Sequence, residues 1–120
     1  MRAQKYADEN GHLDDVAVVA AMVSACADLR STLDEDAEIS ADLPCLQVAL
    51  IAKALVDFVS DQPEAIRPVL DVAEEVLALW DQEGRDFIGA CMLEGVPQGG
   101  EALLLPFAGR LVAEQMSDYL

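Results

Sequence analysis

The stretch from Leu46 to Val59 is the densest apolar segment of the chain, with the sequence LQVALIAKALVDFV. Its strongly polar members are Gln47, Lys53 and Asp57, and because the last two are four residues apart, a helix places them on one strip. The rest of the circumference is then apolar, which predicts a core helix around which the other elements pack. Fourteen residues with two charges are too few to cross a bilayer, which requires about 20 mostly apolar residues.

Four further segments carry apolar residues at spacings of three and four, and each is predicted to be a helix. No run of alternating β-branched residues occurs in the sequence. The sequence therefore predicts an all-α fold of about five helices, packed as a compact bundle or a short α-α superhelix. The four segments run from Asp14 or Asp15 to Leu33, from Pro63 or Pro68 to Glu83 before Gly84, from Arg85 to Gly95, and from Glu101 or Pro106 to Met116.

Length and charge limit the class of protein. The 120 residues predict one domain, with residues 1–11 as a loose N-terminal arm or a short helical turn. The chain is 53% apolar and contains 23 acidic against 7 basic residues, for a net charge of -16, which fits an acidic packed domain better than a disordered chain. Nucleic acid and anionic membranes are disfavoured as partners because both are polyanions, so a basic protein is the expected partner.

Two acidic groups without nearby cations are the predicted partner-binding residues. One occupies the connection at residues 34–42 and the other lies on the predicted third helix. Unbalanced negative charge of this kind speeds association with a basic protein surface. The candidate residues are Asp34, Glu35, Asp36 and Glu38 in the connection, and Asp71, Glu74 and Glu75 on the helix.

A calcium loop is the alternative for the acidic connection, because Asp34, Asp36 and Glu38 alternate as EF-hand ligands do. The sixth position is Ile39, where the sharp turn requires glycine. The twelfth is Cys45, where a bidentate glutamate is required. Both mismatches favour a solvated connection.

The three cysteines, Cys26, Cys45 and Cys91, lie on three separate apolar segments. An odd number of cysteines, so distributed, predicts three buried and reduced thiols in a cytoplasmic protein. The N-terminal flank agrees, because Asp14 and Asp15 precede the first apolar run where a secretion signal would not carry acidic residues.

Residues that could perform catalysis are sparse. The only histidine, His12, is predicted to be a surface residue, so a Cys-His nucleophile pair or a histidine metal site has little to draw on. Carboxylates such as Asp81, Glu83 and Asp86 are close in sequence, but so acidic a chain contains such groups by number alone. The sequence therefore predicts no enzyme activity, no cofactor and no metal site.

Glu94 is the one carboxylate predicted to point inward. It lies seven residues after Phe87 and three after Cys91, on the apolar stripe of the predicted fourth helix. A carboxylate buried near a helix C-terminus requires a cation or N–H donors, and Arg110 and Arg67 are the expected partners. Glu94 is accordingly expected to be a structural anchor, with a recognition role as the alternative.

The C-terminal half also carries a resemblance. An amphipathic helix, RDFIGACMLEGVPQ, contains Leu93, Glu94 and Gly95 and is followed by a polar break and a closing helix, LLLPFAGRLVAEQM. This arrangement resembles small all-α bacterial proteins of unknown function associated with polymorphic toxin systems, some of which are immunity proteins. The resemblance implies a helical inhibitor without catalytic residues.

Three functional hypotheses follow. The first is an acidic, non-enzymatic protein-interaction domain, specifically an immunity-type inhibitor that neutralises a basic partner or toxin. The second is a structural or adaptor module that forms a homo-oligomer or docks in a larger assembly through apolar helix faces, as the Ala-rich first helix suggests. The third, an enzyme or small-molecule binder that uses a cavity among the helices, is disfavoured because no convergent set of polar groups is visible in the sequence.

Overall fold

The regular structure of the protein is helical. The computed structural model describes residues 5–35 and 43–119, and within these ranges it contains no strand, only an isolated bridge between Ala7 and Leu13. The all-α prediction is therefore confirmed for these residues. The α-helices are α1 (Asp15–Ala25), α2 (Asp28–Glu35), α4 (Pro44–Phe58), α5 (Pro63–Leu79), α6 (Gln82–Arg85), α7 (Gly100–Leu104) and α8 (Arg110–Tyr119). A π-helix, η1 (Asp86–Met92), and two 3-10 helices, η2 (Leu93–Gly95) and η3 (Leu105–Phe107), accompany them.

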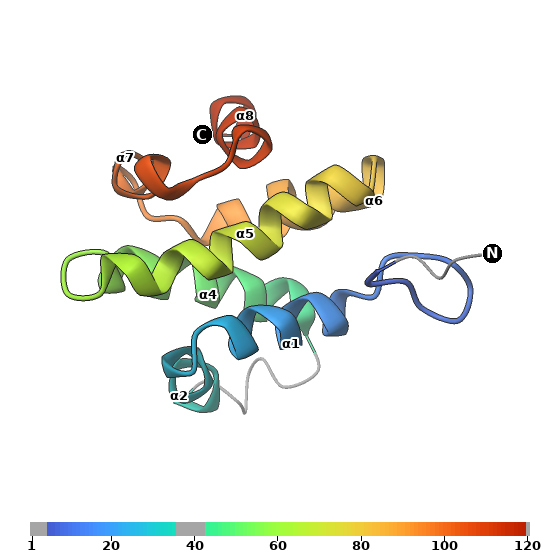
Figure 1. Cartoon of the computed structure of the whole chain (residues 1–120), viewed down its shortest axis with the longest axis horizontal. Helices are drawn as coiled ribbons and strands as arrows, with labels where there is room; N and C mark the ends of the chain where they lie inside the picture. Colours follow the sequence, from blue (N-terminus) through green and yellow to red (C-terminus); the bar gives the residue numbers. More distant parts are fainter. Residues whose placement is uncertain (1–4, 36–42, 120) are drawn as a thin grey trace.

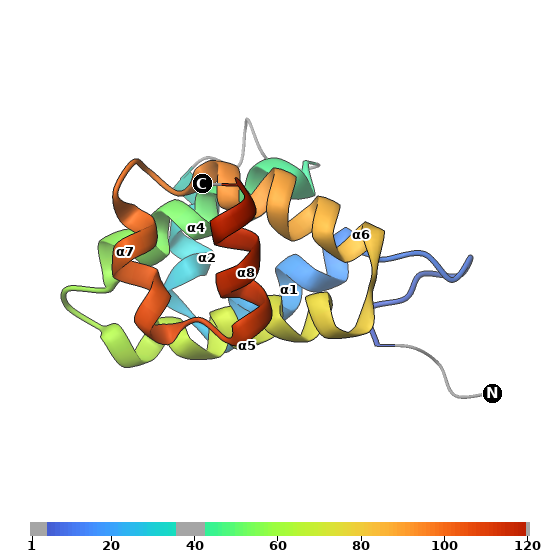
Figure 2. The same ribbon diagram turned by 90° about the horizontal axis from the view of Figure 1, so that it is seen from above.

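The helices α4 and α5 occupy the centre of the molecule (Figure 1). The helices α1 and α2 lie on one side of this pair, and α7 and α8 lie on the other. Seen from above, α8 lies over α5 and beside η1 (Figure 2). Other helices therefore cover the α4–α5 pair on two opposite sides.

The predicted central helix is observed as α4, and it is a core helix as expected. The polar strip of Lys53 and Asp57 is exposed. The apolar faces are buried, and each large aliphatic side chain that is buried stabilises the folded state by about 1.5–3 kcal/mol. No α-helix in the described ranges is long and apolar enough to cross a membrane. The buried residues of α4 are Val48, Ile51, Ala52, Ala54 and Leu55.

The structure has seven α-helices in its described residues where about five were predicted. The predicted first helix is interrupted at Cys26, whose extended backbone (φ -143°, ψ 103°) ends α1. Its apolar periodicity nevertheless continues, because Leu29 in α2 is also fully buried. At the other end of the chain, the predicted last helix is divided, because α7 begins at Gly100, next to the candidate start Glu101, and α8 begins only at Arg110. The other candidate start, Pro106, lies in η3 and does not begin an α-helix.

Proline and glycine positions explain the boundaries of α5. The helix begins at Pro63 and continues through Pro68, so the two prolines belong to one helix. It ends at Leu79, earlier than predicted, and Gly84 lies inside α6. A Cβ atom at Gly84 would lie 2.9 Å from the carbonyl oxygen of Val76, so glycine allows α6 to turn back closely against α5.

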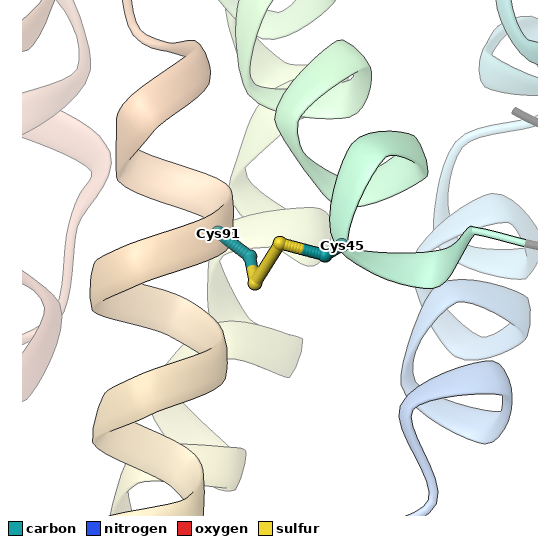
Figure 3. The surroundings of a disulfide bond; sticks show 2 residues. All are labelled: Cys45 and Cys91. Atoms are coloured by element: carbon teal, nitrogen blue, oxygen red, sulfur yellow. A yellow bond between two sulfur atoms is a disulfide. The ribbon is translucent and has the colours of Figure 1, made fainter. Parts of the chain in front are cut away.

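A disulfide bond joins Cys45 in the first turn of α4 to Cys91 in η1, with their Cα atoms 4.9 Å apart (Figure 3). The prediction of three reduced thiols is therefore wrong for this pair, and it holds only for Cys26, which is free and buried. The two partners are 46 residues apart in sequence. Only the packing of η1 against α4 brings them together.

The backbone of η2 approaches α4 closely beside this bridge. A Cβ atom at Gly95 would overlap the backbone carbonyl of Ala49. Glycine is therefore required where α4 and η2 meet, because any side chain would push the two backbones apart.

Residues 5–13 form a folded turn where a loose arm or a short helical turn was expected. The Asp8 carboxylate accepts hydrogen bonds from the backbone N–H groups of Asn10 (2.8 Å) and His12 (3.0 Å). The indole N–H of Trp80 donates to the carbonyl oxygen of Lys5 at 3.0 Å. The turn is therefore tied to the C-terminal end of α5.

Replacing both Cys45 and Cys91 by serine is expected to lower the free energy of unfolding by about 2–4 kcal/mol, because the bridge constrains the unfolded chain. Urea unfolding measures the difference. A thiol reductant should lower the unfolding midpoint of the wild type and leave that of the double variant unchanged. Equal midpoints for wild type and variant under oxidising conditions would contradict the prediction.

Candidate functional site

An acidic pocket of about 370 Å³ opens where the start of α1 meets α6 and η1. Its wall contains three carboxylates, and the rest of its lining is mostly apolar. A volume of this size is in the range of ligand-binding pockets. The lining residues are Leu13, Asp15, Glu83, Asp86, Phe87, Ala90 and Cys91.

A helix start places one of the three carboxylates. Asp14 caps α1 by accepting a hydrogen bond from the backbone N–H of Ala17 (3.2 Å), and Asp15 follows as the first helical residue. A carboxylate is favourable there because the backbone N–H groups of the first turn carry partial positive charge. Asp86 begins η1, which continues from α6 without a break, and its carboxylate accepts from the side-chain amide of Gln82 at 2.7 Å.

The third carboxylate, Glu83, connects the pocket to the N-terminal turn. One of its oxygens lies 2.8 Å from Nδ1 of His12, and the other accepts from the backbone N–H of Leu13 at 3.1 Å. The hydrogen bond with Glu83 and the charge of that carboxylate raise the pKa of His12. The histidine is therefore a surface residue, as predicted, but it is held by a partner.

The electrostatic potential in the pocket is negative at Asp15. Burial raises the pKa of the Asp15 carboxyl, and the neighbouring charges of Asp14 and Glu83 raise it further. No salt bridge to Asp15 is formed among the described residues. A cation entering the pocket would therefore relieve repulsion that the folded protein leaves uncompensated.

The apolar lining suits a long basic side chain. Phe87 is 4% exposed and Leu13 is half-buried, so both can pack against the methylene groups of a lysine or arginine whose charged end meets the carboxylates. No group of three or more metal-ligating side chains is found in the described part of the chain.

The predicted acidic connection lies mostly outside the described residues. Asp36 and Glu38 fall in the range 36–42, which is not described, and Glu35 is the last residue of α2. Asp34, also on α2, is exposed. The structure therefore exposes Asp34 and places Glu35 at the end of α2, whereas Asp36 and Glu38 lie outside the described residues.

The three carboxylates predicted on the third helix have different surroundings in the structure. Asp71 is exposed. Glu74 accepts hydrogen bonds from the backbone N–H groups of Leu111 (3.0 Å) and Val112 (2.9 Å), so it caps the first turn of α8 from a different helix. A Cβ atom at Gly109 would lie 2.5 Å from a Glu74 carboxylate oxygen, so glycine at that position makes room for the cap.

Glu75 is bound by the N-terminal turn. Its carboxylate lies 2.8 Å from Nζ of Lys5 and accepts a hydrogen bond from the Tyr6 hydroxyl at 2.6 Å. These contacts lower the pKa of Glu75, with the Lys5 contact the larger cause. Burial, and then Glu75 itself, raise the pKa of the Tyr6 phenol. Glu75 is therefore engaged within the chain.

The inward placement predicted for Glu94 is wrong, because its side chain is exposed. Counting seven residues from Phe87 assumes α-helical periodicity, but the segment is a π-helix followed by a 3-10 helix. The wider π turn changes the angle per residue and rotates Glu94 outward. Of the expected partners, Arg67 instead lies over the Phe107 ring at 5.5 Å.

The acidic pocket was missed at the level of sequence although each of its carboxylates was visible. In the sequence, Asp15 marks the possible start of the first predicted helix, and Glu83 and Asp86 belong to the carboxylates that so acidic a chain contains by number alone. The hydrogen bond between Leu13 and Glu83 joins residues that are 70 positions apart in the sequence. Sequence spacing contains no signal for an assembly over that distance.

Comparisons with known proteins identify no relative of this chain. No protein-family model, curated protein or solved structure matches the chain. The resemblance to immunity-type proteins accordingly stays a prediction from the sequence.

Replacing Glu74 by alanine is expected to lower the free energy of unfolding by about 1–3 kcal/mol, because two N–H groups of α8 lose a charged acceptor. Asp71→Ala is the matched control, since it removes an exposed carboxylate from the same helix and should change stability by less than about 0.5 kcal/mol. Urea unfolding of both variants measures the difference. Equal midpoints would show that Glu74 does not stabilise α8.

Replacing Glu83 by glutamine is expected to lower the pKa of His12 toward its ordinary range, because the carboxylate that stabilises the imidazolium is removed. Proton NMR follows the only histidine of the chain directly. A raised folded-state pKa means that this pair stabilises the fold below the unfolded pKa and stops doing so as pH rises through the folded pKa. Asp81→Asn, which alters an exposed neighbour, is the control, and an unchanged His12 pKa in Glu83→Gln would refute the assignment.

Proposed function

We propose that the protein is a non-enzymatic, acidic protein-interaction domain whose acidic pocket receives a lysine or arginine side chain of a basic partner. The observation that carries this proposal is the pocket at Asp15, where a carboxylate with a raised pKa stands beside other acidic groups over an apolar floor. A basic side chain supplies both the missing charge and the apolar stem.

The charge of the whole chain supports the same partner. A net charge of -16 attracts a basic protein from a distance and raises its association rate, while repelling nucleic acid and anionic membranes. The contribution to specificity then comes from the pocket, because the long-range field does not distinguish one basic surface from another.

The class of partner that we propose is a toxin domain with a cationic site, which the protein would cover as an immunity-type inhibitor. Two observations support this choice. One is the net charge, and the other is the resemblance of the segment from Arg85 to Met116 to immunity-type proteins. Inhibition by covering a site requires no catalytic residue in the inhibitor.

A structural or adaptor module is the second candidate, and exposed leucines favour it. Leu103 is 47% exposed and Leu105 is 43% exposed, and both lie in the α7–η3 segment. Neighbouring exposed leucines can bury apolar area against another chain or a second copy of this one. Such an interface would be insensitive to salt, unlike contact with the acidic pocket.

The Cys45–Cys91 bridge bears on the compartment in which this function is carried out. Disulfide bonds persist in oxidising compartments and are rare in the cytosol. The bridge therefore favours an oxidising compartment over the cytoplasmic location expected from the sequence.

Replacing Asp15 and Asp86 together by asparagine is expected to weaken binding of the basic partner by about tenfold or more, because two desolvated charge contacts are lost. The partner is isolated on immobilised wild-type protein at low salt, identified, and its affinity measured for both proteins. Wild-type affinity should also fall as pH drops through the pKa of Asp15, because protonation removes the charge that the partner meets. Asp15→Asn should flatten this pH dependence.

The control for this experiment is Asp61→Asn, which removes an exposed carboxylate that lies outside the pocket and is not one of the predicted partner-binding residues. Its affinity should stay within about twofold of wild type, as expected for an exposed charge. Binding that is insensitive to salt and to the Asp15/Asp86 double substitution would refute the pocket and favour the leucine surface.

A further inference from the structure

A second cleft, of about 440 Å³, lies between α8 and the corner formed by α5 and α6. One wall is a single face of α8, because its residues are spaced by three and four. The opposite wall comes from the end of α5 and from α6. The lining residues are Leu111, Glu114, Gln115 and Asp118 on α8, and Leu77, Gln82 and Arg85 opposite.

Gln115 is the unusual residue of this cleft. It is only 8% exposed, and its side-chain oxygen Oε1 is buried without a hydrogen-bond donor. Buried polar atoms are nearly always paired in folded proteins, because an unpaired acceptor has lost water and gained nothing in return. The Gln115 side chain lines the cleft, so a ligand that donates an N–H group would remove this cost once the amide turns its buried oxygen toward the cleft.

The charges around Gln115 indicate the sign of that ligand. Glu114 and Asp118 are exposed at the rim, on the last two turns of α8. The last turn of α8 carries no basic residue, and the C-terminal end of a helix is itself partially negative. Arg85 is the one cation of the lining. Two carboxylates and a helix C-terminus against one guanidinium leave the cleft attractive to a cation.

We propose that this cleft binds a small organic cation, with an ammonium or guanidinium group on a short aliphatic chain. Its N–H groups donate to Oε1 of Gln115 and to the carboxylates of Glu114 and Asp118. Leu77 and Leu111, both half-buried, cover the methylene groups of the chain. A bare metal ion fits less well, because no metal-ligating group of three or more His, Cys, Asp or Glu is found in the described part of the chain.

The test is titration with agmatine, which carries both head groups on a four-carbon chain, followed by calorimetry or NMR. All titrations use the Asp15→Asn/Asp86→Asn variant as the background, because the acidic pocket would otherwise offer the same compound a second site. This background should bind agmatine saturably at one site, and adding Glu114→Gln should weaken the affinity about tenfold. Gln115→Met keeps the length of the side chain but removes the acceptor. It should weaken binding similarly while leaving the unliganded protein at least as stable as wild type, because the unpaired amide is gone.

A control variant and the choice of background separate this site from general attraction to an acidic surface. In the same background, Asp71→Asn should leave the affinity within about twofold. Removing the two carboxylates of the acidic pocket from the background keeps this inference independent of the proposed protein partner. Unsaturable binding, or equal losses in Gln115→Met and Asp71→Asn, would overturn the proposal.

A third titration identifies the source of the head group. The capped tripeptide Gly-Arg-Gly presents a guanidinium as a protein side chain does, whereas agmatine presents it as a free molecule. Tighter binding of agmatine assigns the cleft to a free small molecule. Tighter binding of the tripeptide assigns it to an arginine of another protein, and absence of binding by both compounds overturns the proposal.

Discussion

Close packing of α4 against the η1–η2 segment is the constraint on which the rest of the structure depends. An apolar helix can be buried around most of its circumference only if its neighbours approach its backbone, and Gly95 permits that approach at Ala49. The Cys45–Cys91 bridge joins the same two elements. Because η1 continues directly from α6, this packing also determines where Asp86 and the other carboxylates of the acidic pocket are placed.

The acidic residues of the chain fall into two groups, those that are bound within the fold and those that are not. Some stabilise the fold: Glu74 caps α8 from another helix, and Glu75 holds the N-terminal turn through Lys5. Others, such as Asp15, have no cation beside them in the described part of the chain. A carboxylate with two N–H donors is not available to a partner, so net charge alone overestimates the binding surface.

The two hollows differ in what they lack. The acidic pocket lacks positive charge around Asp15, whose pKa is raised first by burial and then by the charges of Asp14 and Glu83. The cleft beside α8 lacks a hydrogen-bond donor for Gln115. We therefore propose a basic side chain of a partner protein for the acidic pocket. For the cleft we propose a small molecule that donates N–H groups. The sequence-based argument against a small-molecule site was that no convergent polar groups were visible, and they become visible only when α8 faces α6.

Sequence alone determined the helical class and the central helix, because periodicity is a local property of the chain. It placed Lys53 and Asp57 on an exposed strip and Phe87 in the core. The tertiary structure decided the disulfide pairing, the cap provided by Glu74 and both hollows, since each joins residues that are distant along the chain. It also reversed the orientation of Glu94, because a π-helix does not keep the 3.6-residue period on which the prediction relied.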